Sequence, residues 1–267
     1  MAKSRCSLRS QVLYETGGRD QNEDAIYPAD PNGGDRFFIV CDGVGGQRKG
    51  EVASALVCKY FAEYLITSKN FDDTAMLTDG LRYVEEKLLE EIRQQPEYSG
   101  MASTLTILLF APTNQKAMLG WVGDSRIYQV RDGQILFQTK DHSEVQSLVD
   151  MGEITKEEAL HHPKKNIITR AVNGRREARI DQHTIDDIEE NDFFMLCTDG
   201  ILENLNEAKI QEWFLKTEDA EVIKEKIYNN AVGRTKDNFS MILIKVENIE
   251  RSGIKDMFTS LRAKLKL

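Results

Sequence analysis

Three apolar segments, each ending in an aspartate, constrain the fold of this 267-residue chain more than any other feature. Residues 37–46 read Phe-Phe-Ile-Val-Cys-Asp-Gly-Val-Gly-Gly, residues 193–200 repeat the pattern, and residues 119–125 give a weaker version of it. Continuous apolar runs of this length are typical of strands buried on both faces, and the glycines allow the turns that end them. We therefore expect three buried strands, each with a carboxylate at its end: Asp42, Asp124 and Asp199.

Carboxylates at the ends of buried strands are costly unless they are paired or bound to a metal. Asp237, just before the last predicted strand, is a fourth candidate ligand. A donor set made only of oxygen suits Mg²⁺ or Mn²⁺ better than Zn²⁺ or copper. Two cations sharing one carboxylate would relieve the repulsion, and a water held between them would become a hydroxide able to attack phosphorus.

The hydrophobic periodicity predicts an α+β fold. The expected strands cover residues 7–15, 25–28, 36–41, 103–111, 116–122, 126–131, 134–138, 167–172, 179–185, 192–197 and 239–246. The expected helices cover residues 51–69, 73–95, 143–151, 156–161, 207–215 and 220–232. Because most strands connect as hairpins, we predict a four-layer α-β-β-α sandwich with two largely antiparallel sheets flanked by helix pairs.

Composition excludes several classes of protein. The net charge of −9 weighs against a nucleic-acid binder, which normally shows a basic footprint. Neither a signal peptide nor an apolar run of about 18 residues is visible, so we expect no membrane span. The four cysteines form no Cys-x-x-Cys pair, and reduced thiols fit a cytoplasmic protein. For the oligomeric state, a monomer is the default expectation.

Five short motifs occur in order along residues 8–246. They are Arg19-x-x-Asn22-Glu23-Asp24, Asp42-Gly43-x-Gly45-Gly46, Gly123-Asp124-Ser125-Arg126, Thr198-Asp199-Gly200 and Asp237-Asn238. Each motif alone is weak, since Asp-Gly is common in turns. Together they resemble the metal-dependent serine/threonine protein phosphatases of type 2C, the PPM family, in their compact bacterial form.

The resemblance implies a metal-binding role for five residues. Asp42 would bridge two core ions, Mn²⁺ or Mg²⁺, and the Gly43 carbonyl would bind one of them. Asp199 and Asp237 would complete the ligands of the second ion, and Asp124 with Asp199 would hold a weaker third ion.

The resemblance also implies roles around the metals. Arg19 would clamp the substrate phosphate, so Arg19, Asp42 and Asp199 are the expected catalytic residues. Glu23 and Asp24 would orient metal-bound waters, and Asn238 would position the loop of Asp237.

One position departs from part of the family. Some members carry a histidine after the first Asp-Gly, as a proton donor to the leaving alcohol, and Val44 stands here instead. His142 and His161 are alternative donors, although a structural or surface role is favoured for both. Residues 141–170 correspond to the family's flap, whose Lys164 and Lys165 we expect to be solvated rather than bound to a phosphopeptide.

The resemblance implies dephosphorylation of phosphoserine and phosphothreonine on proteins by a hydroxide that bridges two Mn or Mg ions. The expected partners are phosphoproteins and a cognate serine/threonine kinase with its substrates. The alternatives are a pseudophosphatase that binds without turnover and a regulator-specific phosphatase of the sporulation type. A metal-dependent nuclease is disfavoured, because no basic groove is visible.

The expected domains are a catalytic domain over residues 1–248, with the flap at about 141–170, and a basic amphipathic tail or helix over 249–267. A terminal helix docked on the domain is favoured for the tail over a contact with a partner or an anionic surface. Arg126 is expected to pair with nearby acids rather than to touch substrate.

Overall fold

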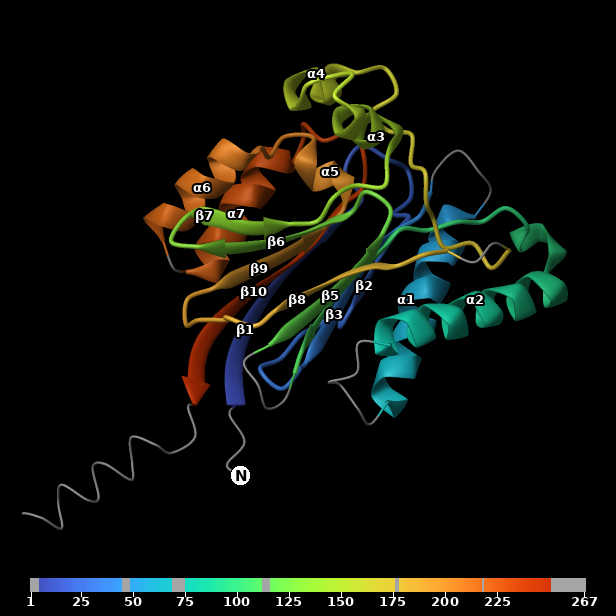
Figure 1. Cartoon of the computed structure of the whole chain (residues 1–267), viewed down its shortest axis with the longest axis horizontal. Helices are drawn as coiled ribbons and strands as arrows, with labels where there is room; N and C mark the ends of the chain where they lie inside the picture. The colour runs from blue at the N-terminus through green and yellow to red at the C-terminus, as the bar shows by residue number, and fades with distance from the viewer. Residues whose placement is uncertain are drawn as a thin grey trace, which may run out of the picture.

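Two five-stranded sheets pack face to face in the computed structural model, which describes residues 5–44, 49–68, 75–111, 116–175, 178–217 and 219–250 (Figure 1). One sheet has the order β1 (Arg5–Glu15), β10 (Phe239–Glu250), β9 (Phe193–Cys197), β6 (Arg126–Arg131) and β7 (Gln134–Gln138). The other has the order β2 (Asp24–Tyr27), β3 (Phe37–Asp42), β4 (Leu105–Phe110), β5 (Ala117–Val122) and β8 (Asp181–Ile185). Every pairing between these strands is antiparallel, as predicted.

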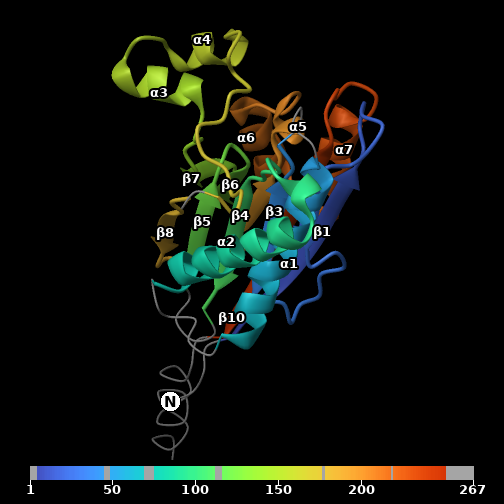
Figure 2. The same ribbon diagram turned by 90° about the vertical axis from the view of Figure 1, so that its right-hand side faces the viewer.

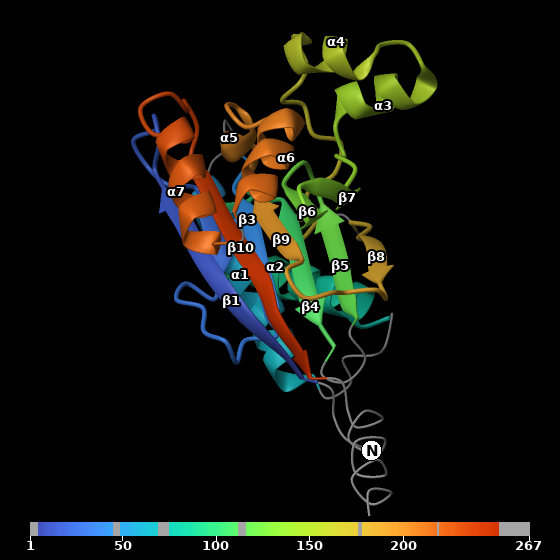
Figure 3. The same cartoon turned by 90° about the vertical axis from the view of Figure 1, so that its left-hand side faces the viewer.

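Helix pairs cover the outer faces of both sheets. The helices α1 (Gly50–Thr67) and α2 (Met76–Gln94) pack on the sheet that contains β3, and Figure 2 shows them across its face. The helices α6 (Glu207–Lys216) and α7 (Ala220–Ala231) pack on the sheet that contains β9, as Figure 3 shows. The predicted four-layer α-β-β-α sandwich is therefore confirmed.

The strands β3 and β9 are continuous apolar runs because both of their faces are covered. In β3, Phe38 and Val40 point into the core between the sheets, whereas Ile39 and Cys41 point into the core beneath α1 and α2. In β9, Phe194 faces the other sheet and packs edge-on against a phenylalanine of β4, with ring centroids 5.3 Å apart. Burial on both faces leaves the strand ends as the places where these strands can carry polar groups.

A lobe of two short helices, α3 (Glu144–Met151) and α4 (Lys156–His161), stands above the sheets at the end where β3 and β9 finish (Figure 3). Little of the lobe is buried, so local interactions sustain it. Ser143 caps α3 by accepting a hydrogen bond from the Gln146 amide, and Thr155 with Glu158 forms a capping box at α4.

The prediction of a strand over residues 167–172 is wrong. Two residues of this segment form isolated bridges, and each has a different partner: Ile168 pairs with Ser143, and Val172 pairs with Ser103. Because these partners belong to separate parts of the chain, no continuous ladder forms. The segment instead ties the end of the lobe back to the sandwich.

The short helix α5 (Asp199–Leu202), directly after β9, was not predicted. The remaining expected elements are present with ends shifted by a few residues, and β10 runs on to Glu250. A short 3₁₀ turn, η1 (Pro96–Tyr98), follows α2. The expected helix ends at residues 69 and 73 lie outside the described residues, as do residues 251–267, which hold most of the expected tail.

No helix within the described ranges is both long enough and apolar enough to cross a bilayer.

Replacing Gly200 by alanine should destabilise the fold. A Cβ atom there would lie 1.9 Å from the backbone oxygen of Asn238, at the entry to β10, and no rotamer change can relieve an overlap with backbone. We expect Gly200→Ala to lower the free energy of unfolding by about 3 kcal/mol in urea titrations. Gly233→Ala is the control: its φ is +71° but nothing lies within 4 Å of the new Cβ, so it should cost about 1 kcal/mol. Equal losses in the two variants would contradict the steric explanation.

Candidate active site

The strand ends that carry the predicted aspartates meet around one cavity of about 350 Å³. Antiparallel pairing explains this, because the start of β10 lies beside the end of β9, with Met241 opposite Cys197. The cavity is lined by Arg19, Glu23, Asp42, Gly43, Val44, Thr104, Asp124, Asn166, Ile168, Asp199, Asp237 and Asn238. All five expected metal-binding residues are therefore on its wall, together with Arg19, Glu23 and Asn238. Gly45 and Gly46 of the second motif lie outside the described residues.

The backbone around Asp42 is held on both sides. Its N–H donates to the Thr104 hydroxyl at 2.8 Å, and its C=O accepts from the Thr104 amide at 2.8 Å and from the Ser103 hydroxyl at 3.0 Å. These bonds fix the end of β3 to the start of β4. The backbone of Asp42 is thus held in place, and its carboxylate faces the cavity.

Gly43 is required where β3 ends. Its N–H donates to the Glu23 carbonyl at 3.0 Å, and a Cβ atom would lie 2.3 Å from the Gly50 carbonyl oxygen. The first turn of α1 and the loop before β2 thus close around this residue. A side chain would push both away from the cavity.

The carboxylates around the cavity repel one another in a poorly solvated place. Burial, followed by repulsion from Asp24 and Asp199, raises the pKa of Asp42 well above its ordinary value. Burial and then Asp199 raise the pKa of Asp124 to about 8, and burial and then Asp237 raise the pKa of Asp199 to about 6. Burial and mutual repulsion thus both disfavour the ionised forms, and a positive charge in the cavity would offset them.

Divalent cations would supply that positive charge, and the donor set fits them. The cavity offers four carboxylates and a backbone carbonyl, all hard oxygen donors of the kind that Mn²⁺ and Mg²⁺ prefer. In the part of the chain that the structure describes, no three acidic, histidine or cysteine side chains already converge into a closed metal-binding set. The acids therefore line an open cavity and do not form a complete coordination site by themselves.

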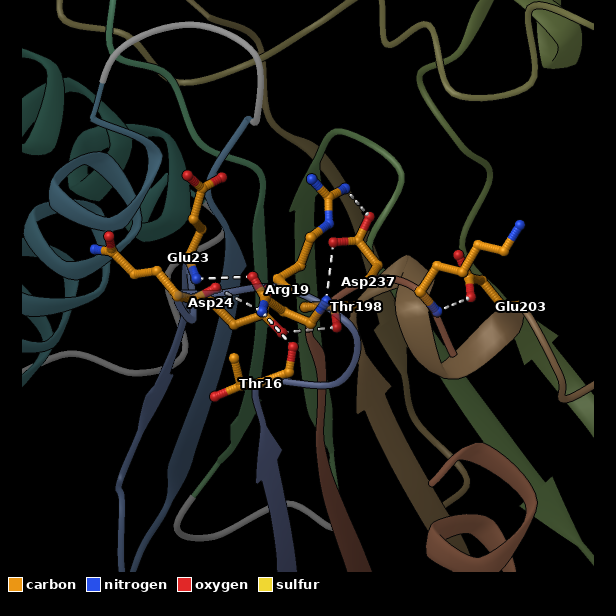
Figure 4. Close-up of polar contacts among 10 residues, drawn as sticks. Thr16, Arg19, Glu23, Asp24, Thr198, Glu203 and Asp237 are labelled. Atoms are coloured by element: carbon orange, nitrogen blue, oxygen red, sulfur yellow. Dashed lines mark hydrogen bonds and ion pairs between the residues drawn. The ribbon is translucent and has the colours of Figure 1, made fainter. Parts of the chain in front are cut away.

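Arg19 reaches into the cavity from the loop between β1 and β2. Its Nη2 donates to Asp237 Oδ2 at 2.7 Å, and Figure 4 shows the guanidinium turned toward this carboxylate. The hydrogen bond to Asp237 is the main reason that the pKa of Arg19 is raised. The guanidinium is about half exposed, so its other N–H groups stay available to a ligand.

Asn238 fastens the loop of Arg19 to the start of β10. Its Nδ2 donates to the carbonyls of Thr16 at 2.8 Å and Gln21 at 2.9 Å, and its Oδ1 accepts from the Glu23 amide at 2.8 Å. One side chain thus satisfies three backbone groups across the loop. The resemblance implies that Asn238 positions the loop of Asp237, and its side-chain contacts join that loop to the loop of Arg19.

Asp24 lies beneath the cavity rather than on its wall. Asp24 is 4% exposed. In the pairing of β2 with β3 it lies opposite Asp42. The Thr198 hydroxyl donates to Asp24 Oδ2 at 3.1 Å and accepts from the Ser240 amide, so the group joins the two sheets (Figure 4). Among the described residues, Asp24 Oδ1 has no hydrogen-bond partner, and burial raises the pKa of this carboxyl to about 7.

Arg126 makes the ion pair expected from the sequence. Its Nε and Nη2 donate to the two carboxylate oxygens of Asp141 at 2.8 and 2.7 Å, and its Nη1 donates to the Tyr128 hydroxyl at 3.1 Å. Asp141 is the first residue of segment 141–170, which contains the lobe of α3 and α4 and which we call the flap. The pair therefore ties the flap to β6 and leaves Arg126 no role in the cavity wall.

The alternative proton donors do not line the cavity. His142 is buried and bound through both ring nitrogens, and His161 lies exposed on α4. Lys164 pairs with Glu144 on the surface of the flap, as expected for a solvated charge. Val44, which stands where some family members carry a histidine, lies on the cavity wall and offers no proton.

Sequence reasoning missed three residues of the wall: Thr104, Asn166 and Ile168. Thr104 follows from the pairing of β4 with β3, which the sequence does not specify in register. Asn166 and Ile168 come from the return arm of the flap, where no motif marks them.

Comparison with known proteins agrees with this geometry. The family model for protein phosphatase 2C matches residues 18–231. The serine/threonine protein phosphatase PstP of Mycobacterium tuberculosis is 34% identical over 248 residues, which are 92% of this chain and 46% of that protein. The chain thus spans about half the length of this relative.

Solved structures share the fold over nearly the whole chain. Serine/threonine phosphatase Stp1 from Staphylococcus aureus superposes with a TM-score of 0.82 at 28% identity, over 93% of this chain and 98% of that one. The catalytic domain of PstP in complex with two manganese ions gives a TM-score of 0.76 at 31% identity, over 91% and 100% of the two chains. With a family model that matches most of its length and these relatives, the chain belongs to the protein phosphatase 2C family.

Proposed function

We propose that this chain hydrolyses phosphoserine and phosphothreonine on proteins in a metal-dependent reaction. The observation that carries the proposal is the gathering of Asp42, Asp124, Asp199 and Asp237 with Arg19 around one open cavity. Acids alone would repel a phosphate, and an arginine alone would bind one without hydrolysis. Their combination suits a site that takes up both cations and a phosphate monoester.

Five residues on the cavity wall are the proposed metal ligands. Asp42, the Gly43 carbonyl, Asp199 and Asp237 would hold two Mn²⁺ or Mg²⁺ ions, and Asp124 with Asp199 would hold a weaker third ion. Bound divalent cations supply an activated water nucleophile and neutralise charge on the phosphoryl oxygens. Manganese is supported by the PstP catalytic domain, whose structure contains two manganese ions.

The remaining residues of the wall would bind and orient the substrate. Arg19 offers a planar pair of N–H groups that matches two oxygens of a phosphate. Asn238 keeps the loop of Arg19 in place through three backbone hydrogen bonds. Glu23 stands on the same wall, where its carboxylate can orient water, and burial raises its pKa. With Val44 at the wall, water would protonate the leaving alcohol.

Two alternative functions are less well supported. A pseudophosphatase would bind phosphoproteins without turnover, but every acid of the motifs except Asp24 lines the cavity. A phosphatase specific for one sporulation regulator would share the same site, and no feature of the described residues selects such a substrate. We also infer phosphoproteins as substrates and a cognate serine/threonine kinase as the opposing enzyme, with residues 1–248 as the catalytic domain of a monomer.

Removal of the metals or of one ligand should abolish turnover. We expect Mn²⁺-dependent release of phosphate from p-nitrophenyl phosphate and from a phosphothreonine peptide, lost in EDTA and reduced at least about 100-fold in Asp199→Asn. Asp186→Asn is the control, because Asp186 lies on the surface in an exposed pair with Lys116. Undiminished release in EDTA would contradict the proposal. Tight binding of the phosphopeptide without any release would favour the pseudophosphatase.

Arg19→Lys should weaken use of phosphopeptides while the protein stays folded. Lysine keeps the positive charge but loses the two-pronged contact, so we expect kcat/KM to fall by about 10- to 100-fold, mainly through KM. Arg82→Lys on the exposed surface of α2, where Arg82 pairs with Asp79, serves as the matched control. An unchanged KM in Arg19→Lys would remove Arg19 from the phosphate site.

Asn238→Asp should loosen the loop that carries Arg19. The substitution keeps the oxygen that accepts from Glu23 but removes both N–H donors. The Gln21 carbonyl then loses its bond to residue 238, and the Thr16 carbonyl keeps only the long bond from the Arg19 amide, at 3.4 Å. We expect a loss of about 2 kcal/mol in the free energy of unfolding, measured by urea titration. Asn206→Asp makes the same chemical change at the N-cap of α6, where aspartate caps equally well. Comparable stability of the two variants would show that the Asn238 donors matter little.

A further inference from the structure

His142 lies buried where the flap leaves the sandwich, next to the turn that carries Asp124. Its side chain is 7% exposed, and its backbone N–H donates to the Gly123 carbonyl at 2.8 Å. Its ring Nδ1 accepts a hydrogen bond from the Gly123 amide at 3.0 Å. A single residue thus satisfies both backbone groups of Gly123, the residue directly before Asp124.

The contacts of the ring define its tautomer. Since Nδ1 accepts from an N–H, it carries no hydrogen, and the proton of the neutral imidazole lies on Nε2. Nε2 is 3.2 Å from Asp181 Oδ2 on β8, to which it donates. Arg170 Nη1 also lies 3.2 Å from Nε2, but a guanidinium only donates, so it makes no hydrogen bond to the protonated Nε2. Arg170 Nη1 also donates to Asp181, at 2.7 Å, so one carboxylate receives the histidine and the last residue of the flap.

The surroundings of the ring hold it in this orientation. The indole of Trp121 stacks on it with centroids 6.2 Å apart and planes 13° from parallel, and the Trp121 Nε1–H donates to the Lys140 carbonyl at 2.8 Å. On the return arm of the flap, the Thr169 amide donates to the His142 carbonyl at 2.7 Å. His142, itself on the outgoing arm, is therefore hydrogen-bonded to the return arm and to the Asp124 turn.

The electrostatic environment agrees with a neutral ring. Burial lowers the pKa of His142 below its ordinary value, with Asp181 opposing that shift and the positive charge of Arg170 adding to it. Asp141, at the start of the flap, also faces the ring and favours its charged form. Protonation of Nδ1 would set two donors, the ring N–H and the Gly123 N–H, against each other.

We propose that His142 is a positioning residue: as the neutral Nε2–H tautomer, it fixes the base of the flap to the turn that carries Asp124. The return arm supplies Asn166 and Ile168 to the same cavity wall as Asp124. His142 thereby sets how the flap side of the cavity lies relative to the aspartates. This role in catalysis rests on the proposed phosphatase function, whereas the structural role does not.

Two conservative substitutions separate the two ring contacts. In His142→Asn the side-chain oxygen replaces Nδ1 and can still accept from Gly123, but nothing reaches Asp181. In His142→Gln the terminal amide replaces Nε2 and can still donate to Asp181, but Gly123 loses its acceptor. His142→Phe keeps the stack on Trp121 and removes both hydrogen bonds. The control is His183→Gln on β8, since His183 is an exposed histidine stacked on Phe137.

The first measurement needs neither metal nor substrate. Nitrogen NMR of the whole chain labelled at histidine should show His142 Nδ1 without a proton, and the ring should remain neutral as the pH falls through about 6.5. Hydrogen exchange of the Gly123 amide should be about tenfold faster in His142→Gln and His142→Phe, and near the native rate in His142→Asn and His183→Gln. A proton on Nδ1, or equal exchange in the Asn and Gln variants, would overturn the proposal.

The second measurement tests the link to catalysis. In the Mn²⁺-loaded protein, kcat/KM for a phosphothreonine peptide should fall by about tenfold or more in His142→Gln and His142→Phe, with a smaller loss for p-nitrophenyl phosphate, which has no peptide chain for the flap to contact. His142→Asn should recover most of this loss. Equal activity in the Asn and Gln variants would refute the positioning role. An inactive native protein would refute the proposed function instead and leave the tautomer and exchange results standing.

Discussion

Mutual repulsion among carboxylates at the ends of buried strands is the constraint on which the rest of the structure depends. Asp42, Asp124 and Asp199 share a cavity in which burial and one another's charge raise the pKa of each. Such a cluster is unfavourable for folding alone, and the fold tolerates it because two well-packed sheets hold the strand ends in place. The stability of the sandwich core thus offsets a site whose charge suits it to bind cations.

Part of this arrangement could be predicted from the sequence, and the reason lies in burial. A strand covered on both faces must be apolar throughout, so an aspartate at the end of residues 37–42 stands out against its neighbours. The same contrast revealed Asp199. Asp237 was a fourth candidate because it precedes the last predicted strand, and the resemblance carried by the motifs added Arg19. The pairing of Arg126 with a nearby acid was also predicted, and its partner in the structure is Asp141.

The remainder depended on contacts between distant segments. Residues 167–172 look like a strand in the sequence because they include β-branched residues, which favour strands. In the structure Ile168 and Val172 form only isolated bridges, since no continuous partner strand lies beside them. The helix α5 is too short to show a periodicity. Asn166 enters the cavity wall only because the flap folds back over it, and a single sequence carries no signal for that return.

Two neutral side chains hold the loops around this acidic cavity, and their neutrality follows from the charge already present. Asn238 satisfies three backbone groups of the Arg19 loop, and His142 satisfies both backbone groups of Gly123. An acidic side chain in either place would add to the repulsion among the aspartates. A basic one would compete with the cations for them. A neutral amide or imidazole can join several backbone groups while the charge of the site stays reserved for metal and phosphate.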